Sequence, residues 1–134
     1  MPEHAEVTFS SLFRSRTSPF YWDTIEAWNK SGIADASGVC LDPRIEVWVE
    51  FKVTYNIKGK LKFKPMQPPW LMQRRRRGSN VYVAVRHYKW IHLYDGLQAL
   101  ALSKNGIIGV PTLLSIEMPW SWSHMVHQLQ QPLT

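Results

Sequence analysis

The sequence has little that would tie the chain to a membrane or to an oxidising compartment. Its one cysteine, Cys40, excludes a disulfide within the chain and suits a reducing compartment. No apolar run approaches the ~18 residues of a membrane-spanning helix, so we expect no membrane association. The first residues show no cationic region followed by an apolar one. We therefore expect no signal peptide and a cytoplasmic location.

Internal repeats, low-complexity linkers and an acidic surplus are also missing from the sequence. Acidic residues number 10 against 16 Lys and Arg, which gives a net charge of +6. This balance favours an anionic partner, most often nucleic acid. The 134 residues are 45% apolar and include seven Trp. They suffice for one domain, residues 1–134, with a hydrophobic core.

The first segments carry acids among aromatic residues. Residues 5–16 are predicted to be a helix, in which Glu6, Phe9 and Phe13 share one stripe. Glu6 is then either an inward-facing functional acid or a solvated acid favoured by the helix dipole. Residues 20–28 are rich in aromatics and favour a strand, in which Glu26 shares a face with Trp22.

The remaining pattern alternates strands and helices, which predicts an α/β fold with a mixed central sheet flanked by helices. Predicted strands cover 34–41, 45–54, 80–86 and 88–94, with a further extended segment at 107–117. Predicted helices cover 65–77, 97–104 and 119–130.

The segment 34–54 is predicted to be a β-hairpin with a charged face. Apolar residues alternate with Glu46, Trp48, Glu50 and Lys52 along its second strand, so the charged side chains point away from the core. A type I turn at Asp42–Arg44 predicts that Asp42 lies opposite Ile45. In that register Asp35 lies opposite Lys52 and diagonal to Glu50, and all three side chains share a face.

These residue types suit a divalent cation. Carboxylates on adjacent strands, here Asp35 and Glu50, form a hard oxygen site for Mg²⁺. Water activated there can attack a phosphodiester, and Lys52 can stabilise the developing negative charge. Alternating charge on an exposed strand face is also ordinary, so the spacing alone leaves both interpretations open.

Five short motifs follow one another in a recognisable order from about Gly32 to Arg86. They are GIAD, the hairpin, VWVEFKV, LKFKPMQPPWL and GSNVYVAVR. Their order and spacing resemble the PD-(D/E)xK nuclease superfamily, closest to its Holliday-junction-resolvase-like and VRR-NUC branch, which includes small phage endonucleases. The resemblance implies a restriction-endonuclease-like core. One departure is Ala34, where the branch usually has Pro before the Asp.

The resemblance assigns roles to individual residues. Asp35, Glu50 and the carbonyl of Phe51 would bind Mg²⁺, with Mn²⁺ as a possible substitute. Lys52 would be the catalytic lysine, and Gln67 would support the site or contact the scissile phosphate. The acid of the family's first helix matches Glu6 best, with Glu3 and Glu26 as the alternatives.

Two basic segments flank the predicted site. Four Arg end the helix at 65–77, where they either contact phosphates or offset the helix dipole. Four Lys alternate with other residues just before that helix. The predicted nucleic-acid-binding residues are Arg74, Arg75, Arg76, Arg77, Lys58, Lys60, Lys62 and Lys64.

The expected function is therefore a metal-dependent endonuclease that hydrolyses DNA, either branched DNA or a specific duplex site. Cutting both strands needs two sites, so a homodimer is expected. The compact size and the resemblance suggest a phage gene, which would place the protein in the cytoplasm of the host cell. The alternative is a non-catalytic DNA-binding or virion-associated protein that retains the nuclease fold.

Overall fold

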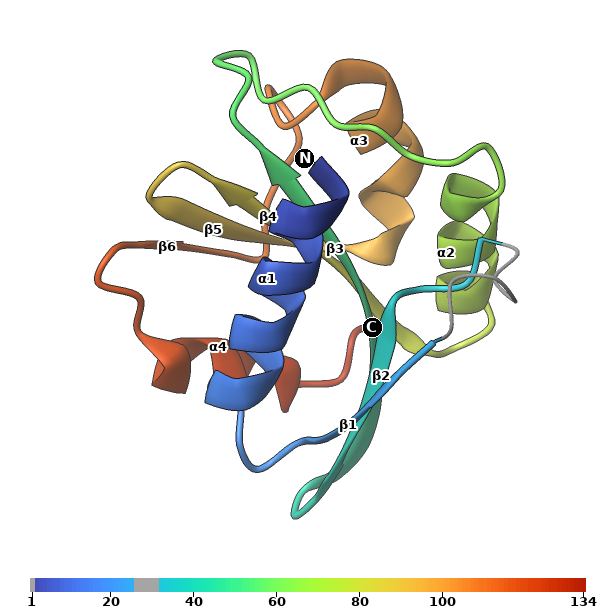
Figure 1. Ribbon diagram of the computed structural model, residues 1–134. Helices are drawn as coiled ribbons and strands as arrows, with labels where there is room; N and C mark the ends of the chain where they lie inside the picture. The colour runs from blue at the N-terminus through green and yellow to red at the C-terminus, as the bar shows by residue number, and fades with distance from the viewer. Residues whose placement is uncertain (1, 26–31) are drawn as a thin grey trace.

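The computed structural model describes residues 2–25 and 32–134, with the side chains of Pro2 and Glu3 left out. A mixed sheet runs through the molecule in the order β1–β2–β3–β4–β5–β6 (Figure 1). Strands β3 and β4 are parallel, and all other neighbours are antiparallel. The strands are β1 (Tyr21–Thr24), β2 (Ala36–Leu41), β3 (Arg44–Thr54), β4 (Asn80–His87), β5 (Trp90–Asp95) and β6 (Leu114–Glu117).

Helices flank both faces of this sheet, which confirms the predicted α/β architecture. They are α1 (Pro2–Arg16), α2 (Gln67–Arg76), α3 (Ala99–Asn105) and α4 (Trp122–Leu129), with a short 3-10 helix, η2 (Gly96–Gln98), before α3. One core joins side chains of α1 and α4 to the sheet, and a second joins side chains of α2 and α3. Within the described residues, no helix is long and apolar enough to cross a membrane.

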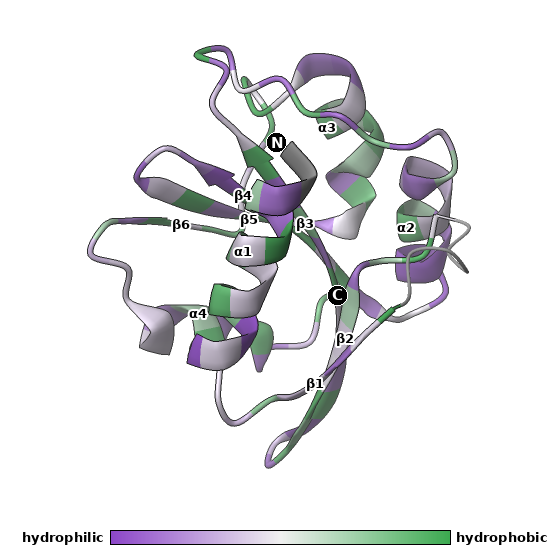
Figure 2. Ribbon diagram, viewed as in Figure 1, coloured by the Kyte–Doolittle hydropathy of each residue, from purple (hydrophilic) through white to green (hydrophobic). Residues whose placement is uncertain are grey.

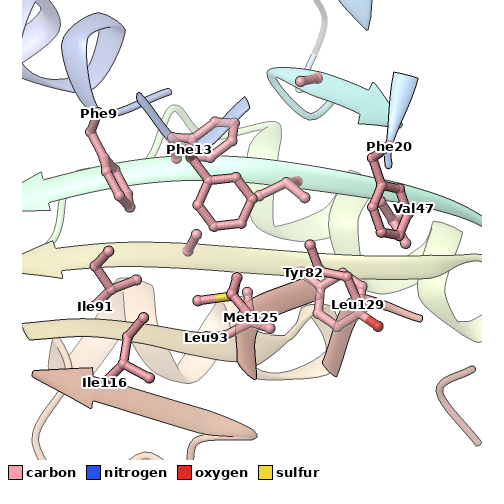
Figure 3. Close-up of a cluster of buried hydrophobic side chains, with 14 of the residues drawn as sticks. Phe9, Phe13, Phe20, Val47, Tyr82, Ile91, Leu93, Ile116, Met125 and Leu129 are labelled. Carbon is pink, nitrogen blue, oxygen red and sulfur yellow. The ribbon is translucent and has the colours of Figure 1, made fainter. Parts of the chain in front are cut away.

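The core under α1 and α4 is built from the apolar half of β3. Val47, Val49 and Phe51 point to this side, as the alternation in the sequence predicts. Phe9 and Phe13 of α1 are buried against them, which confirms the predicted inward stripe of that helix (Figure 3). The two Phe rings lie edge-on to Phe51, with centroid distances of 5.6 and 5.1 Å, an arrangement that aromatic pairs prefer.

The core under α2 and α3 uses the alternate residues of β4. Val81, Val83 and Val85 are fully buried there against Leu71 and Leu102 of the two helices. Because β4 is parallel to β3 and lies beside it, this core adjoins the face of β3 that carries Glu50 and Lys52. The part of this face that carries Glu50 and Lys52 is therefore covered and does not face open solvent.

The structure corrects the register of the β2–β3 hairpin. Leu41 pairs with Arg44, so Asp42 and Pro43 alone form the connection and the predicted type I turn is wrong. Two-residue connections are the commonest in hairpins, because their twist matches that of the strands. The ladder ends at Ala36 and Val49. One more step along it puts Asp35 opposite Glu50, where the sequence had predicted Lys52.

Some predicted elements are shorter than expected. The extended segment 107–117 forms a strand only at Leu114–Glu117. The predicted strand 20–28 is a strand at Tyr21–Thr24. Glu26 and Trp28 of the same prediction lie outside the described residues.

Candidate metal centre and its basic surroundings

Strand β3 holds two charged side chains in the interior of the protein. Glu50 is 2% exposed and Lys52 is 5% exposed. Residues two apart in a strand point to the same face, so the two side chains are neighbours. The Nζ atom of Lys52 lies 3.4 Å from Oε2 of Glu50. Charges this deep are costly unless they are paired and hydrogen-bonded, so the partners of each side chain decide whether the arrangement is tenable.

Gln67, the first residue of α2, connects both charges. Its Nε2 donates to Oε2 of Glu50 at 2.7 Å, and its Oε1 accepts from Nζ of Lys52 at 3.2 Å. The same Oε1 also accepts from the backbone N–H of Lys64 at 2.9 Å. Because donors surround Oε1 and a carboxylate faces Nε2, the orientation of the amide is fixed by its partners. We call Glu50, Lys52 and Gln67 the polar network.

The segment before α2 closes the polar network from one side. The Nζ atom of Lys52 donates to the carbonyl of Lys62 at 2.7 Å, and it lies 4.6 Å from the centre of the Phe63 ring. These contacts leave the ammonium group fixed in direction, next to Glu50. Sequence reasoning assigned this segment only a basic surface. The alternation in LKFK was the available signal that one side of it packs inward.

Asp35 is bonded to β3 just beyond the end of the β2–β3 ladder. Its Oδ2 accepts a hydrogen bond from the backbone N–H of Phe51 at 2.9 Å. Its own carbonyl accepts from the N–H of Ile25 at 2.9 Å, which continues the pairing of β1 with β2. The register differs from the predicted one by two residues, and a shift of two preserves the face of every side chain. Asp35 and Glu50 therefore still share a face.

A glycine ties Asp35 to the start of α2. Gly32 has a φ of +81°, which a glycine adopts readily. A Cβ atom there would lie 2.2 Å from the carbonyl oxygen of Met66, the residue before Gln67. Only glycine fits this contact, so the first residue of the GIAD motif brings the Asp35 segment against the end of α2 that supplies Gln67.

The donor atoms suit Mg²⁺. Asp35 and Glu50 offer carboxylate oxygens, and Phe51 offers a carbonyl that points to the same side of β3 as its N–H, toward Asp35. Mg²⁺ prefers oxygen ligands and keeps several waters, so this small set is adequate. Among the described residues, no group of three or more His, Cys, Asp or Glu is arranged to hold a metal. The candidate centre has only two such side chains, Asp35 and Glu50, and its third protein ligand would be a backbone carbonyl.

Of the three candidates for the further acid, the structure describes the side chain of Glu6 alone. Glu6 is half-buried and lines a cleft of about 410 Å³ together with Lys52, Thr54, Tyr55, Lys60 and Lys62. Helix α1 thus brings Glu6 to the same cleft as the lysine of the polar network. Glu26 and the side chain of Glu3 lie outside the described part of the chain.

The four predicted Arg, three at the end of α2 and Arg77 directly after it, have different environments. Arg76 and Arg77 are exposed, whereas the guanidinium of Arg74 lies over the Trp48 ring, 5.0 Å from its centre. Arg75 is 7% exposed, and its Nε donates to Oδ1 of Asp95 at 2.9 Å. Its Nη2 donates to the backbone oxygen of Thr134 at 3.0 Å. Arg75 therefore joins α2 to the rest of the fold, and we leave it out of the surface that would contact phosphates.

The predicted lysines remain on the surface. Lys58, Lys60, Lys62 and Lys64 are all exposed. They lie along the connection from β3 to α2. The backbone of this connection contacts the polar network, because the Lys62 carbonyl accepts from Lys52 and the Lys64 N–H donates to Gln67. The positive charge is thus adjacent to Lys52 and to the cleft that contains Glu6.

Two further titratable groups lie on the same face of the sheet, on β5. Burial lowers the pKa of His92, and the nearby His87 lowers it further. Burial raises the pKa of Tyr94 to about 12. Both side chains are therefore mainly neutral at pH 7, and neither adds appreciable positive charge to this face.

No protein-family model matches the sequence, and neither does any of the curated proteins. The functional argument therefore rests on the residues and their geometry.

Proposed function

We propose that the protein is a metal-dependent endonuclease that hydrolyses phosphodiester bonds in DNA. The observation that carries the proposal is that Asp35 lies on the same face of the sheet as Glu50 and Lys52. The Asp35 carboxylate bonds to the backbone of Phe51, between the two residues of the polar network. Buried charges of this kind contribute little to stability, which favours a chemical role for them.

Each residue has a part in the proposed reaction. Asp35, Glu50 and the Phe51 carbonyl would hold Mg²⁺ or Mn²⁺. A bound Mg²⁺ supplies Lewis-acid activation of water and offsets charge on the phosphate. Lys52 would stabilise the negative charge that develops as water adds to phosphorus and the P–O ester bond breaks. Gln67 bonds to both Glu50 and Lys52, so it positions the carboxylate and the ammonium relative to each other.

The substrate would be held by the exposed cations beside this centre. Phosphates would be bound by Arg76 at the end of α2, by Arg77 directly after it and by the Lys residues of the β3–α2 connection. Such contacts position the DNA without reading its sequence. A double-strand cut requires two centres, so we propose a homodimer acting on branched DNA or on a duplex site.

The test is cleavage of a labelled four-way junction and a linear duplex, with Mg²⁺ and with EDTA. Cleavage is expected in Mg²⁺ only, with Mn²⁺ as a substitute. Glu50→Gln should lower the rate about a thousandfold, which is ~4 kcal/mol of transition-state stabilisation. Binding to DNA in EDTA should stay the same or become tighter, because a carboxylate near phosphate is removed.

Glu46→Gln is the matched control. Glu46 lies on the same strand and points to the same side as Glu50, but it is exposed. This variant should cut like the wild-type protein. The proposed centre would be refuted if both DNAs were cut equally in Mg²⁺ and in EDTA. Equal cleavage rates for Glu50→Gln and Glu46→Gln would refute it as well. Protein that binds DNA without cutting it would instead support the non-catalytic alternative.

A further inference from the structure

The chain makes a well-defined turn directly after β3, at Asn56–Gly59. The N–H of Gly59 donates to the carbonyl of Asn56 at 2.8 Å, and the N–H of Lys58 donates to the Asn56 side chain at 2.9 Å. Gly59 has a φ of +66°, which suits glycine. This combination is typical of an Asx turn, so Ile57 lies at the apex of a turn with fixed geometry. We call residues Asn56–Gly59 the apex turn.

Neighbouring segments brace the apex turn from two sides. On one side His87 contacts the carbonyl of Asn56 at 2.8 Å, and the hydroxyl of Tyr88 donates to the carbonyl of Tyr55. On the other side the N–H of Ile107 donates to the carbonyl of Gly59 at 3.1 Å. The turn is therefore held by the β4–β5 hairpin and by the loop after α3, and its apex has little freedom to fold back.

The braced apex presents apolar side chains to solvent. Ile57 is 87% exposed, the highest value among the large apolar side chains in the described part of the chain. Tyr55 is 56% exposed and Tyr88 is 45% exposed, and their rings pack edge to face at 5.7 Å. An exposed Ile side chain forgoes the stabilisation that burial of its apolar surface would give. A rigid turn that holds it outward calls for a partner that covers it.

The surroundings of the apex indicate the chemistry of that partner. Lys58 and Lys60 flank Ile57 and are exposed, and the cleft beyond them leads to Lys52. In Figure 1 the apex turn projects past the end of β3, away from the β2–β3 hairpin. Figure 2 shows hydrophobic and hydrophilic residues mixed along this connection. Lysines are depleted from the cores of protein interfaces, whereas they are the usual contacts to phosphates.

We propose that the apex turn is a wedge that inserts Ile57 between base pairs of DNA and unstacks them next to the cleavage centre. Apolar side chains that enter a base step in this way kink the duplex, while neighbouring cations hold the phosphates. Lys58 and Lys60 supply those cations, and the paired rings of Tyr55 and Tyr88 add exposed apolar surface beside the turn. The inference rests on the proposed function for its choice of DNA. It adds that the substrate is DNA that unstacks easily, such as a branch point or a flexible step.

The test measures unstacking without cleavage. A four-way junction and a linear duplex would carry 2-aminopurine, an adenine analogue that fluoresces more strongly when unstacked, at the branch point and at TA steps, which deform easily. Wild-type protein added in EDTA should raise the emission severalfold. Ile57→Ala should remove most of this rise and weaken binding about tenfold, which corresponds to ~1.4 kcal/mol. Its salt dependence should not change, because no charge is lost.

Two control variants separate the wedge from general effects. Leu41→Ala alters an exposed apolar residue of the hairpin at the opposite end of β3 and should behave like the wild-type protein. Lys58→Ala should lower the slope of log K against log salt by about 0.9 while keeping the emission rise. Thermal unfolding would confirm that all variants are folded, as expected for exposed positions.

The outcomes distinguish this inference from the proposed function. No emission rise with either DNA, or equal responses of Ile57→Ala and Leu41→Ala, would overturn the wedge even if the protein cuts DNA in Mg²⁺. An Ile57→Ala variant that sediments as a smaller species with an unchanged emission rise would also overturn it and assign the apex to a contact between copies. An Ile57-dependent emission rise without any cleavage in Mg²⁺ supports the wedge and refutes the nuclease.

Discussion

The two faces of β3 contain opposite chemistry on alternate residues of one strand. Phe51 is fully buried against Phe9 and Phe13 in an aromatic core, whereas Glu50 and Lys52 on either side of it are buried in a polar network. Burial of an aromatic ring stabilises a fold directly. Burial of an ion pair is at best close to neutral, because desolvation offsets the attraction. One face of the strand therefore stabilises the fold, whereas the other holds an ion pair that contributes little to stability.

The largest expected effect on stability comes from truncating a side chain on the aromatic face of β3. Phe51→Ala should lower the free energy of unfolding by about 3–5 kcal/mol, because it leaves a cavity between β3 and α1. Denaturant unfolding followed by circular dichroism measures the loss. Val7→Ala on the exposed side of α1, where Val7 is 65% exposed, should change stability by less than about 0.5 kcal/mol. A small effect of Phe51→Ala would mean that the aromatic core can collapse around the missing ring.

Replacing the charges on the other face should have a smaller effect on stability. The double variant Glu50→Gln with Lys52→Met keeps the volumes and removes both charges, so its free energy of unfolding should lie within about 1 kcal/mol of the wild-type value or above it. Lys52→Met alone should be less stable than the double variant, since it leaves the Glu50 charge without its ammonium partner. A double variant as unstable as Phe51→Ala would show that the polar network stabilises the fold.

The smallest expected effect concerns His92, on β5. Its pKa is lowered in the folded protein, so the folded state binds fewer protons than the unfolded chain as the pH falls below about 6.5. The stabilising contribution is full above that pH and declines below it. Thermal unfolding from pH 7.5 to 5 should therefore show a shallower decline for His92→Asn than for the wild-type protein. His124→Asn, at an exposed position of α4, should follow the wild-type curve. Identical slopes for His92→Asn and wild type would exclude His92 as a source of the pH dependence.

The faces of β3 could be predicted from sequence because alternation is a local property. Apolar residues at every second position fix which side chains point to the core, whatever the partner strand. The hairpin register depended on the length of the connection, and the predicted turn was wrong by two residues. The shared face of Asp35 and Glu50 survived this error because side chains repeat with a period of two.

The surroundings of the site could not be predicted in the same way. Arg75 and Arg76 are adjacent in a run of identical residues, yet one is buried and the other exposed. The difference arises from Asp95, which is distant in sequence and comes close only when the sheet and α2 pack together. The contacts of Lys52 with the Lys62 carbonyl and with Gln67 are likewise products of tertiary packing.

The Asp35 carboxylate has both a structural contact, the hydrogen bond from the Phe51 amide, and a proposed role as a ligand. It closes the end of the β2–β3 ladder, where a backbone carbonyl would otherwise accept, and it is also a proposed ligand. A carboxylate has several lone pairs, so it can accept the amide proton and bind a cation together. Asp35→Asn retains an oxygen acceptor for the amide, whereas Asp35→Ala removes it. The hydrogen-exchange rate of the Phe51 amide therefore reports whether the side chain at position 35 still holds the end of β2 against β3. A cation bound by the same carboxylate would change that rate as well.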